Sequence, residues 1–266
     1  MFKKLRVLIS AQHALMLAYR AEIYLWVLAH VLPFIMMSIW MTAAGANGGG
    51  RFSMSAVGYA QYFAAVFIVR QFTAVWMIYE FEWHVNEGRL SPMLLRPMNV
   101  LWHYVSAHLG EQLARFPFFL LMLTLFFVCY PAAFWWPGAG GLVFGVIAIY
   151  SAFALRFALN FCLCTMNFWM ERASSLDQLM MLPYLFLSGL IIPMRDMPAG
   201  LRTFSYYTPF PYLIDFPARI LMGQIGVLSG EFWQGFGVMA IWFGVFFCVG
   251  GVLWRRGLLQ YSGHGA

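Results

Sequence analysis

Three arginines lie inside long apolar stretches of this sequence, and their side chains are well suited to bind an anion. They are Arg70, Arg115 and Arg156. A guanidinium presents five N–H donors in a planar fork that matches a carboxylate or a phosphate. Two interpretations of Arg70 and Arg156 stay open, namely recognition of an anionic headgroup such as a phosphate, or structural pairing with carbonyls or acids of a neighbouring helix. The Arg115 side chain is expected to extend to an aqueous surface.

A group of acidic and histidine side chains follows the first of these arginines. Its members are Glu80, Glu82, His84 and Glu87. An acid and a histidine that converge on one point could act in general acid–base catalysis. On a helix, Glu80, His84 and Glu87 suit a surface that docks with another protein equally well.

The sequence gives little support for a nucleotide-binding loop, a metal site or reactive cysteines. The only lysines are Lys3 and Lys4, and neither belongs to a G-x-x-x-x-G-K-[ST] phosphate loop, so ATP must be hydrolysed on another polypeptide. His103 and His108 are slightly off register for a shared metal ion on one helix face, and no metal or cofactor is expected on this chain. Four cysteines lie in apolar runs and should pack as small core residues: Cys129, Cys162, Cys164 and Cys248.

The composition indicates what surrounds these side chains. Of 266 residues, 62% are hydrophobic and only 10% are charged, and the mean hydropathy is +0.73. Several runs of roughly 18 to 25 residues carry almost no charge, which is enough for a helix to cross about 30 Å of hydrocarbon. We therefore predict an all-α, polytopic membrane protein in which residues 1–266 form a single transmembrane domain.

Six membrane spans are predicted, together with three other segments. Residues 1–20 should form an amphipathic helix in the membrane interface, the polar region 80–99 should lie in water or against a partner, and the broken region 194–230 should form two short re-entrant helices in the outer leaflet. Since a charge near the bilayer centre costs at least about 2.5 to 3.5 kcal/mol, Arg70 and Arg156 should face a subunit interface or conduit. The spans are expected at about 22–41, 57–79, 112–130, 141–166, 176–193 and 232–254.

The distribution of positive charge predicts the orientation. The net charge of +6 is spread over the ends of the spans instead of forming a patch, so nucleic acid is not expected as a partner. Six spans place both termini on one side, and the excess of basic residues there predicts that both termini and region 80–99 are cytoplasmic. The basic residues on that side are Lys3, Lys4, Arg6, Arg20, Arg89, Arg96, Arg172, Arg255 and Arg256, and those on the opposite side are Arg51, Arg195, Arg202 and Arg219.

Region 80–99 is the most polar stretch of the chain. Pro97 ends a helical piece shortly before the next span, so a short helix would be held between two membrane helices and could transmit a push. Its mixture of charged and apolar side chains suits docking in a groove of another protein, although an ordinary solvated loop helix is the alternative. The residues predicted on its exposed face are Glu87, Arg89, Leu90, Met93, Leu94 and Arg96.

Three segments carry a resemblance to a known family. They are NEGRLSPMLLRPMN, the stretch from Ser188 to Gly223 that begins SGLIIPMRDMPAG, and the C-terminal GLLQYSGHGA. With these segments in this order, the chain resembles the permeases of type-2 ABC exporters, which have the type V exporter fold. It looks like a member of a branch with paired paralogous permeases, and the resemblance covers nearly the whole chain.

This resemblance implies the transmembrane subunit of an exporter in the bacterial inner membrane, which is not an enzyme by itself. The implied partners, besides membrane lipids, are a cytoplasmic ABC ATPase dimer that carries ATP and Mg, and a second permease, either a paralogue or another copy. Arg70 and Arg156 would line the translocation path of an amphiphilic, lipid-, glycan- or drug-like substrate. The ATPase would contact Glu82, Glu87, Gly88, Arg89, Leu90, Met93, Leu94 and Arg96, and the outer gate would be shaped by Pro198, Pro209, Tyr212, Arg219 and Gly223.

Two other functions are weighed against this one. An intramembrane lipid-modifying transferase would use the acid and histidine group around His84. A secondary transporter is disfavoured because 266 residues show no internal repeat. Co-purification with an ATPase whose activity responds to changes at Glu87 or Arg89 would distinguish the exporter from both alternatives.

Overall fold

The computed structural model describes residues 2–18, 31–46 and 52–261, and every regular element in these ranges is a helix, which confirms the predicted all-α class. The longer helices are α1 (Phe2–Ala18), α3 (Leu32–Ala46), α4 (Ala56–Thr73), α5 (Met77–Asn86), α7 (Val100–Cys129), α8 (Gly138–Cys164), α9 (Ser174–Leu187) and α12 (Gly230–Gln260). The short elements are α6 (Leu90–Leu94), α10 (Ala199–Tyr206), α11 (Asp215–Leu221) and the 3-10 turns η1 (Pro131–Ala133), η2 (Thr165–Phe168) and η3 (Phe210–Leu213).

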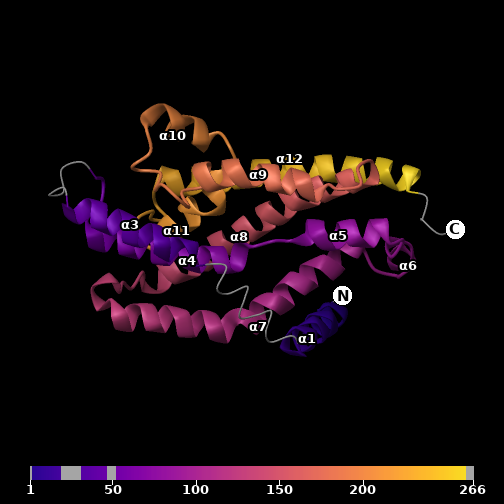
Figure 1. The fold of residues 1–266 in the computed structure, drawn as a ribbon, viewed down its shortest axis with the longest axis horizontal. Coiled ribbons are helices and arrows are strands. Elements are labelled where there is room, and N and C mark those ends of the chain that lie inside the picture. Colours follow the sequence, from indigo (N-terminus) through magenta and orange to yellow (C-terminus); the bar gives the residue numbers. More distant parts are fainter. Residues whose placement is uncertain (1, 19–30, 47–51, 262–266) are drawn as a thin grey trace.

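The helices form one elongated bundle whose long members run roughly along its length (Figure 1). The marked N and C ends lie toward the same end of the bundle as α6, whereas α10 and α3 lie toward the other end. Apart from α5, which continues in the direction of α4, the successive long helices from α3 to α12 alternate in direction, as a multi-pass membrane protein requires.

Four helical stretches in the described residues are long and apolar enough to cross a membrane: Ala56–Asn86, Val100–Cys129, Gly138–Phe168 and Gly230–Gln260. They match four of the six predicted spans in position. The first predicted span begins in residues 22–30, which lie outside the described residues, and continues into the apolar helix α3. The 14 residues of α9 reach only about 21 Å at 1.5 Å per residue, so the count of six spans stays a prediction.

The second predicted span is interrupted, which corrects the expectation of one continuous helix at 57–79. α4 ends at Thr73 and α5 begins at Met77, and we call residues 74–76 between them the α4–α5 break. Side chains of α7 bind the backbone there: Gln112 donates to the Phe72 carbonyl at 2.8 Å, and the Trp76 N–H donates to His108 at 3.0 Å. Because these partners satisfy backbone groups that lipid cannot, the helix can break inside the bundle.

The third predicted span starts earlier than expected. α7 begins at Val100 instead of near residue 112, and the Asn99 side chain caps it by accepting from the Leu101 N–H at 2.9 Å. One polar residue before 112, His108, is 3% exposed. Its side chain lies inside the bundle, where it accepts from the Trp76 N–H.

The fifth predicted span ends earlier than expected. α9 stops at Leu187, six residues before the predicted limit at 193. The chain turns at Gly189, whose φ of +87° is a left-handed conformation that residues with a Cβ rarely adopt. The turn directs the chain toward α10 and α11, which lie in the region predicted to hold two short helices.

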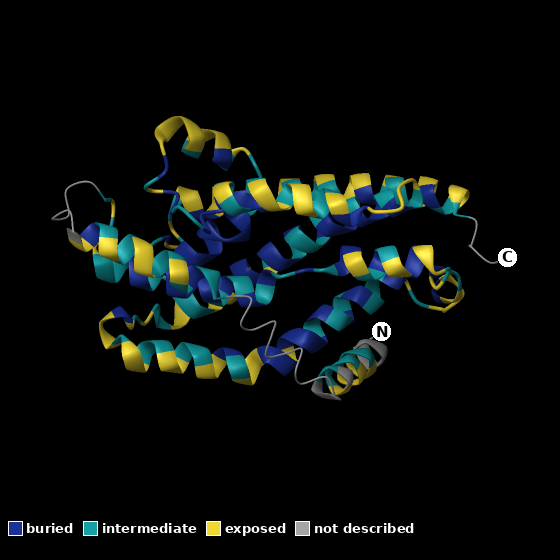
Figure 2. Ribbon diagram, viewed as in Figure 1, coloured by how far each residue is buried: buried dark blue, intermediate teal, exposed yellow. Residues whose placement is uncertain are grey.

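The core consists mainly of two clusters of buried apolar side chains. The larger one packs α4, α8 and α11 around residues such as Tyr62 and Leu213, and the smaller one packs α5, α7 and α8 around Phe81 and Tyr104. The outer faces of α7 and α12 are largely exposed (Figure 2). Only 11% of the most apolar window of α12 is buried, so this apolar face is available to lipid or to another subunit.

The α1 helix lies against α7, and Gly110 permits their close approach. A Cβ atom at Gly110 would lie 2.9 Å from Cβ of Gln12 and 3.2 Å from the Ile9 carbonyl oxygen. α1 therefore packs onto the bundle within the range 1–20 predicted to form an interfacial helix.

Candidate functional site

The exposed tip formed by α5 and α6 is the first candidate site. We define the α5–α6 tip as residues 83–97, and it lies at the same end of the bundle as the two chain ends (Figure 1). Leu95 is 87% exposed and Leu94 is 37% exposed, beside the exposed Glu87, Arg89 and Arg96. The Arg89 guanidinium lies 4.1 Å from the centre of the Trp83 ring. Solvent-exposed leucines beside charged groups are typical of a surface that binds another protein.

Three residues predicted to contact an ATPase lie elsewhere than expected. Leu90 is fully buried and Met93 is 7% exposed, so the prediction that they belong to the exposed face is wrong. A face cannot be assigned reliably to a helix of five residues, and these two side chains attach α6 to the bundle. Glu82 accepts from the Ser174 N–H at 2.8 Å and so binds the N-terminus of α9.

Gly88 turns the chain between α5 and α6. Its φ is +67°, which favours glycine over any residue with a Cβ. The turn is closed by the Glu87 N–H, which donates to the Trp83 carbonyl at 3.0 Å, and by the Gly88 N–H, which donates to the Val85 carbonyl at 3.2 Å. Gly88 therefore shapes the tip through its backbone.

The α4–α5 break is the second candidate site, because it connects the tip to the centre of the bundle. Besides the His108 contact, the Trp76 indole N–H donates to Glu111 at 2.9 Å. The Ile78 N–H at the start of α5 donates to the Asn160 side chain of α8 at 2.9 Å. The beginning of α5 is thus attached to both α7 and α8 by polar groups.

A cavity of about 390 Å³ lies beside the break, and both predicted arginines line it. Arg70 comes from α4, Trp76 from the break, Arg156 from α8, and Asp177 and Tyr184 from α9. The Arg156 guanidinium lies 4.1 Å from the centre of the Tyr184 ring. Nη1 of Arg70 and Nε of Arg156 are buried without a hydrogen-bond partner. We call this space the arginine cavity.

The charges of the arginine cavity are not balanced. Asp177 is the one acid among its lining residues, and its Oδ1 accepts from the Asn160 amide at 3.2 Å. Within the described ranges, no ion pair joins Asp177 to Arg70 or Arg156. Structural pairing of the arginines with an acid of a neighbouring helix, one of the two interpretations from the sequence, therefore finds no partner there.

Arg115 does not extend to an aqueous surface, which corrects the expectation from the sequence. It is 3% exposed, and its Nε lies 3.6 Å from Oε1 of Glu111 one turn earlier on α7. Its Nη2 also donates to the Gln71 carbonyl at 3.5 Å, next to the break. Arg115 and Glu111 thus form a buried pair that supports the end of α4.

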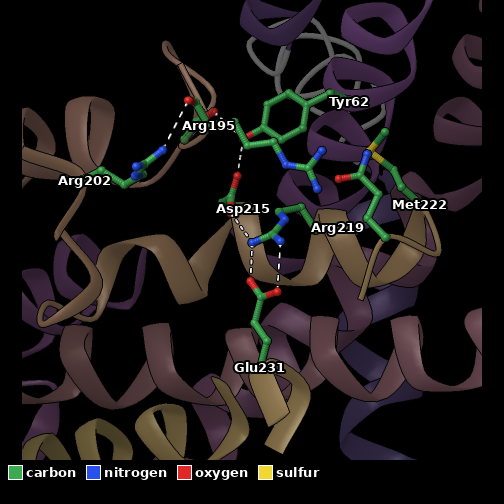
Figure 3. A network of polar contacts seen from close by, with 9 residues as sticks. Tyr62, Arg195, Arg202, Asp215, Arg219, Met222 and Glu231 are labelled. Carbon is green, nitrogen blue, oxygen red and sulfur yellow. Dashed lines mark hydrogen bonds and ion pairs between the residues drawn. The ribbon is translucent and has the colours of Figure 1, made fainter. Parts of the chain in front are cut away.

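A network of polar contacts joins α4, α11 and α12 toward the opposite end of the bundle (Figure 3). Nη1 and Nη2 of Arg219 donate to the two carboxylate oxygens of Glu231 at 2.6 and 3.2 Å. Arg219 also lies 3.7 Å from Asp215 one turn earlier. The Tyr62 hydroxyl is 2.9 Å from both Asp215 and the Gly189 carbonyl. The network therefore fixes α11 against two long helices and the turn after α9.

Burial and charge act in opposite directions on the acid and the base of this network. Burial raises the pKa of Asp215, whereas the nearby Arg219 and the hydrogen bond from Tyr62 lower it. Burial lowers the pKa of Arg219, but Asp215 and Glu231 raise it, and the net direction is upward. Arg219 is therefore held as a cation between two acids.

The residues predicted to shape an outer gate surround this network in different ways. Tyr212 and Arg219 line a second cavity of about 380 Å³, and the Tyr212 hydroxyl donates to the Tyr206 carbonyl at 3.1 Å. Pro198 precedes α10, and Pro209 precedes η3. Gly223 has a φ of +72° and follows α11.

The group that a transferase would use converges only in part. Glu80 lies 3.2 Å from Nε2 of His103, His84 lies 2.8 Å from the Tyr104 hydroxyl, and Glu82 binds α9. Glu80 and His103 do form an acid–histidine contact, and the centres of the His84 and His103 rings lie 6.1 Å apart, but Glu82 binds α9 instead of joining them. These contacts join α5 to α7 and α9.

Several residues of these sites were not singled out from the sequence. The spacing of four between Asp215 and Arg219 is a signal for contact on one helix face. Asp177 and Tyr184 are seven residues apart, which also places them on one face of α9. Glu231 and the role of Trp76 had no local signal, because their partners are distant in the sequence.

The comparisons with known proteins agree with this architecture. A family profile described as "ABC-2 family transporter protein" matches residues 49–265, which include every described element from α4 to α12. The comparison with curated proteins gives no match. Since the matched range covers most of the chain and contains the tip, the break and both cavities, this membrane protein belongs to the ABC-2 transporter family as a permease subunit.

Proposed function

We propose that this chain is the transmembrane subunit of an exporter that moves an amphiphilic substrate outward across the bacterial cytoplasmic membrane. ATP would be hydrolysed, with Mg, by a dimer of a separate ABC ATPase. A second permease subunit, a paralogue or another copy of this chain, would complete the membrane part. Family membership supports an ATP-binding partner, and residues 1–266 contain no G-x-x-x-x-G-K-[ST] phosphate loop, which supports placing ATP hydrolysis outside these residues.

One observation carries the proposal: a single short helix connects an exposed docking surface to the wall of an internal cavity. α5 begins at the α4–α5 break, whose Trp76 lines the arginine cavity, and ends at the exposed α5–α6 tip. A force applied to the tip by an ATPase would act on α5. Since α5 contributes Tyr79 to the cavity lining, its movement would change the cavity directly.

The bundle and its charges support one orientation in the membrane. The tip lies toward the same end as the two chain ends (Figure 1), and the sequence has more basic residues on that side than on the other. The positive-inside rule therefore supports a cytoplasmic tip. The region of α10 and α11 would face outward, where Pro198, Pro209, Tyr212, Arg219 and Gly223 would shape the exit.

Co-purification tests the docking surface. The tagged permease is expressed in its source cells, and the ATP hydrolysis that co-purifies with it is measured for the wild type and for Leu95→Glu. Leu95 is 87% exposed, so the substitution should not disturb folding. A buried charge at the centre of an interface typically costs about 2 kcal/mol or more, and we expect at least about a tenfold loss of bound ATPase.

Arg195→Glu, which reverses an exposed charge near α10, is the matched control and should retain the ATPase. Transport by the purified permease with no ATPase present would refute the proposed function. Equal ATPase recovery with wild type and Leu95→Glu would refute the docking surface.

A further inference from the structure

The arginine cavity has the size and charge of a binding site for an anionic group. Its volume of about 390 Å³ falls at the lower end of the range of about 300–1,000 Å³ for ligand sites. Two guanidiniums and one carboxylate line it, so one positive charge has no counterpart among the lining residues. In an apolar surrounding, such a charge is stabilised strongly by a bound anion.

The two arginines indicate where the anion would bind, because both residues line the cavity and each keeps a buried N–H group without a partner. Nη1 of Arg70 and Nε of Arg156 are buried and have no hydrogen-bond partner. The two residues come from different helices, α4 and α8, and line the same space. Tyr184 holds the Arg156 guanidinium at 4.1 Å from its ring, which orients the side chain without using its N–H groups. The oxygens of a phosphate match such paired donors.

Two of the lining residues, Tyr79 and Met181, are large and exposed, which indicates what is attached to the anion. Tyr79 is 47% exposed and Met181 is 40% exposed, and both line the cavity. Both lie on helices that border the apolar interior of the bundle. A headgroup could therefore occupy the cavity while a hydrocarbon chain leaves past these two side chains into lipid.

We propose that the arginine cavity binds the phosphate headgroup of an amphiphilic substrate, with Arg70 and Arg156 as the recognition residues. This inference rests on the proposed export function and names the class of substrate. Because Trp76 and Tyr79 form part of the same cavity, a movement of α5 would change the affinity of the cavity for the headgroup. ATP hydrolysis would then be coupled to release of the substrate through these two residues.

Equilibrium binding tests the proposal. The purified permease, with its co-purifying ATPase, is titrated with a fluorescent short-chain phosphatidic acid and with the phosphatidylcholine analogue of the same chain length. We expect phosphatidic acid to bind at least about tenfold more tightly, because its phosphate monoester has a net negative charge and free oxygens for both arginines, whereas the phosphate of phosphatidylcholine is esterified to a choline cation that offsets its charge.

Arg70→Gln and Arg156→Gln should each weaken this binding about tenfold, and Arg156→Lys, which keeps the charge but loses the fork, should weaken it less. Arg255→Gln removes an exposed positive charge near the C-terminus and should change nothing.

Several outcomes would overturn the proposal. Equal affinity for the two lipids, or unchanged affinity in both glutamine variants, would exclude headgroup recognition by these arginines. Competition by inorganic phosphate as strong as by the lipid would assign the site to a free anion. Loss of the second permease from Arg156→Gln, with lipid binding intact in Arg156→Lys and Arg70→Gln, would assign Arg156 to subunit pairing. In each case retained ATPase would leave the proposed function standing, whereas a complex that never contains an ATPase would refute that function alone.

Discussion

At the scale of single residues, several side chains and one glycine have structural roles that depend on the residues they contact. Arg219 holds α11 to α12 through two hydrogen bonds to Glu231. Gly189 brings the turn after α9 into contact with Tyr62 and Asp215. Arg70 and Arg156 stand out in the sequence because they interrupt apolar runs, but Tyr184 and Asp177 could be assigned to the same cavity only from the packing of α8 and α9.

A substitution at Gly189 should test the turn after α9. A Cβ atom there would lie 2.5 Å from the Tyr62 hydroxyl, and the φ of +87° is unfavourable for alanine. We expect Gly189→Ala to destabilise the protein by about 1–3 kcal/mol, seen as a lower thermal unfolding temperature in detergent. Gly200→Ala is the control, because no atom lies within 4 Å of a Cβ built at Gly200. Equal unfolding temperatures of the two variants would contradict this account of the turn.

At the scale of helices, the interruption between α4 and α5 is the feature that the sequence did not reveal. The long apolar pattern from residue 57 predicts one span, and the helical propensities of residues 74–76 give no stop signal. The break depends on partners in α7, since Gln112, His108 and Arg115 bind backbone groups beside it. Such contacts are distant in the sequence, whereas the existence of α7, α8 and α12 follows from local hydropathy and was predicted.

Removing one of these contacts should destabilise the backbone conformation of the α4–α5 break. Gln112→Met keeps the size of the side chain but leaves the Phe72 carbonyl without the donor at 2.8 Å. We expect a loss of about 1–3 kcal/mol in stability, and less ATP-dependent transport per ATPase bound, because α5 would no longer be held at its origin. Leu113→Met, at a neighbouring position that is 55% exposed, should behave as the wild type. A Gln112→Met protein with wild-type unfolding temperature and transport would show that this hydrogen bond does not support the break.

At the scale of the whole molecule, the bundle has two distinct ends, and we propose a function for each. The tip and both marked chain ends lie toward one end, and α10 lies toward the other (Figure 1). Hydropathy and charge counts predict that the end with the tip is cytoplasmic, because they depend on composition averaged over long segments, and this orientation stays a prediction. They did not predict the side-chain partners within each end, and they placed Leu90 and Met93 on the wrong face of α6.

We propose that the α5–α6 tip faces the cytoplasm and binds the ATPase there, and the accessibility of single cysteines tests this orientation. Leu95, which is 87% exposed on the tip, and Leu228, which is fully exposed between α11 and α12, are replaced singly by cysteine after the native cysteines are removed. Labelling is then measured with a membrane-impermeant thiol reagent. The account predicts that Leu95→Cys reacts only in inside-out vesicles and is protected by bound ATPase, while Leu228→Cys reacts in intact cells. Labelling of Leu95→Cys in intact cells would contradict the account.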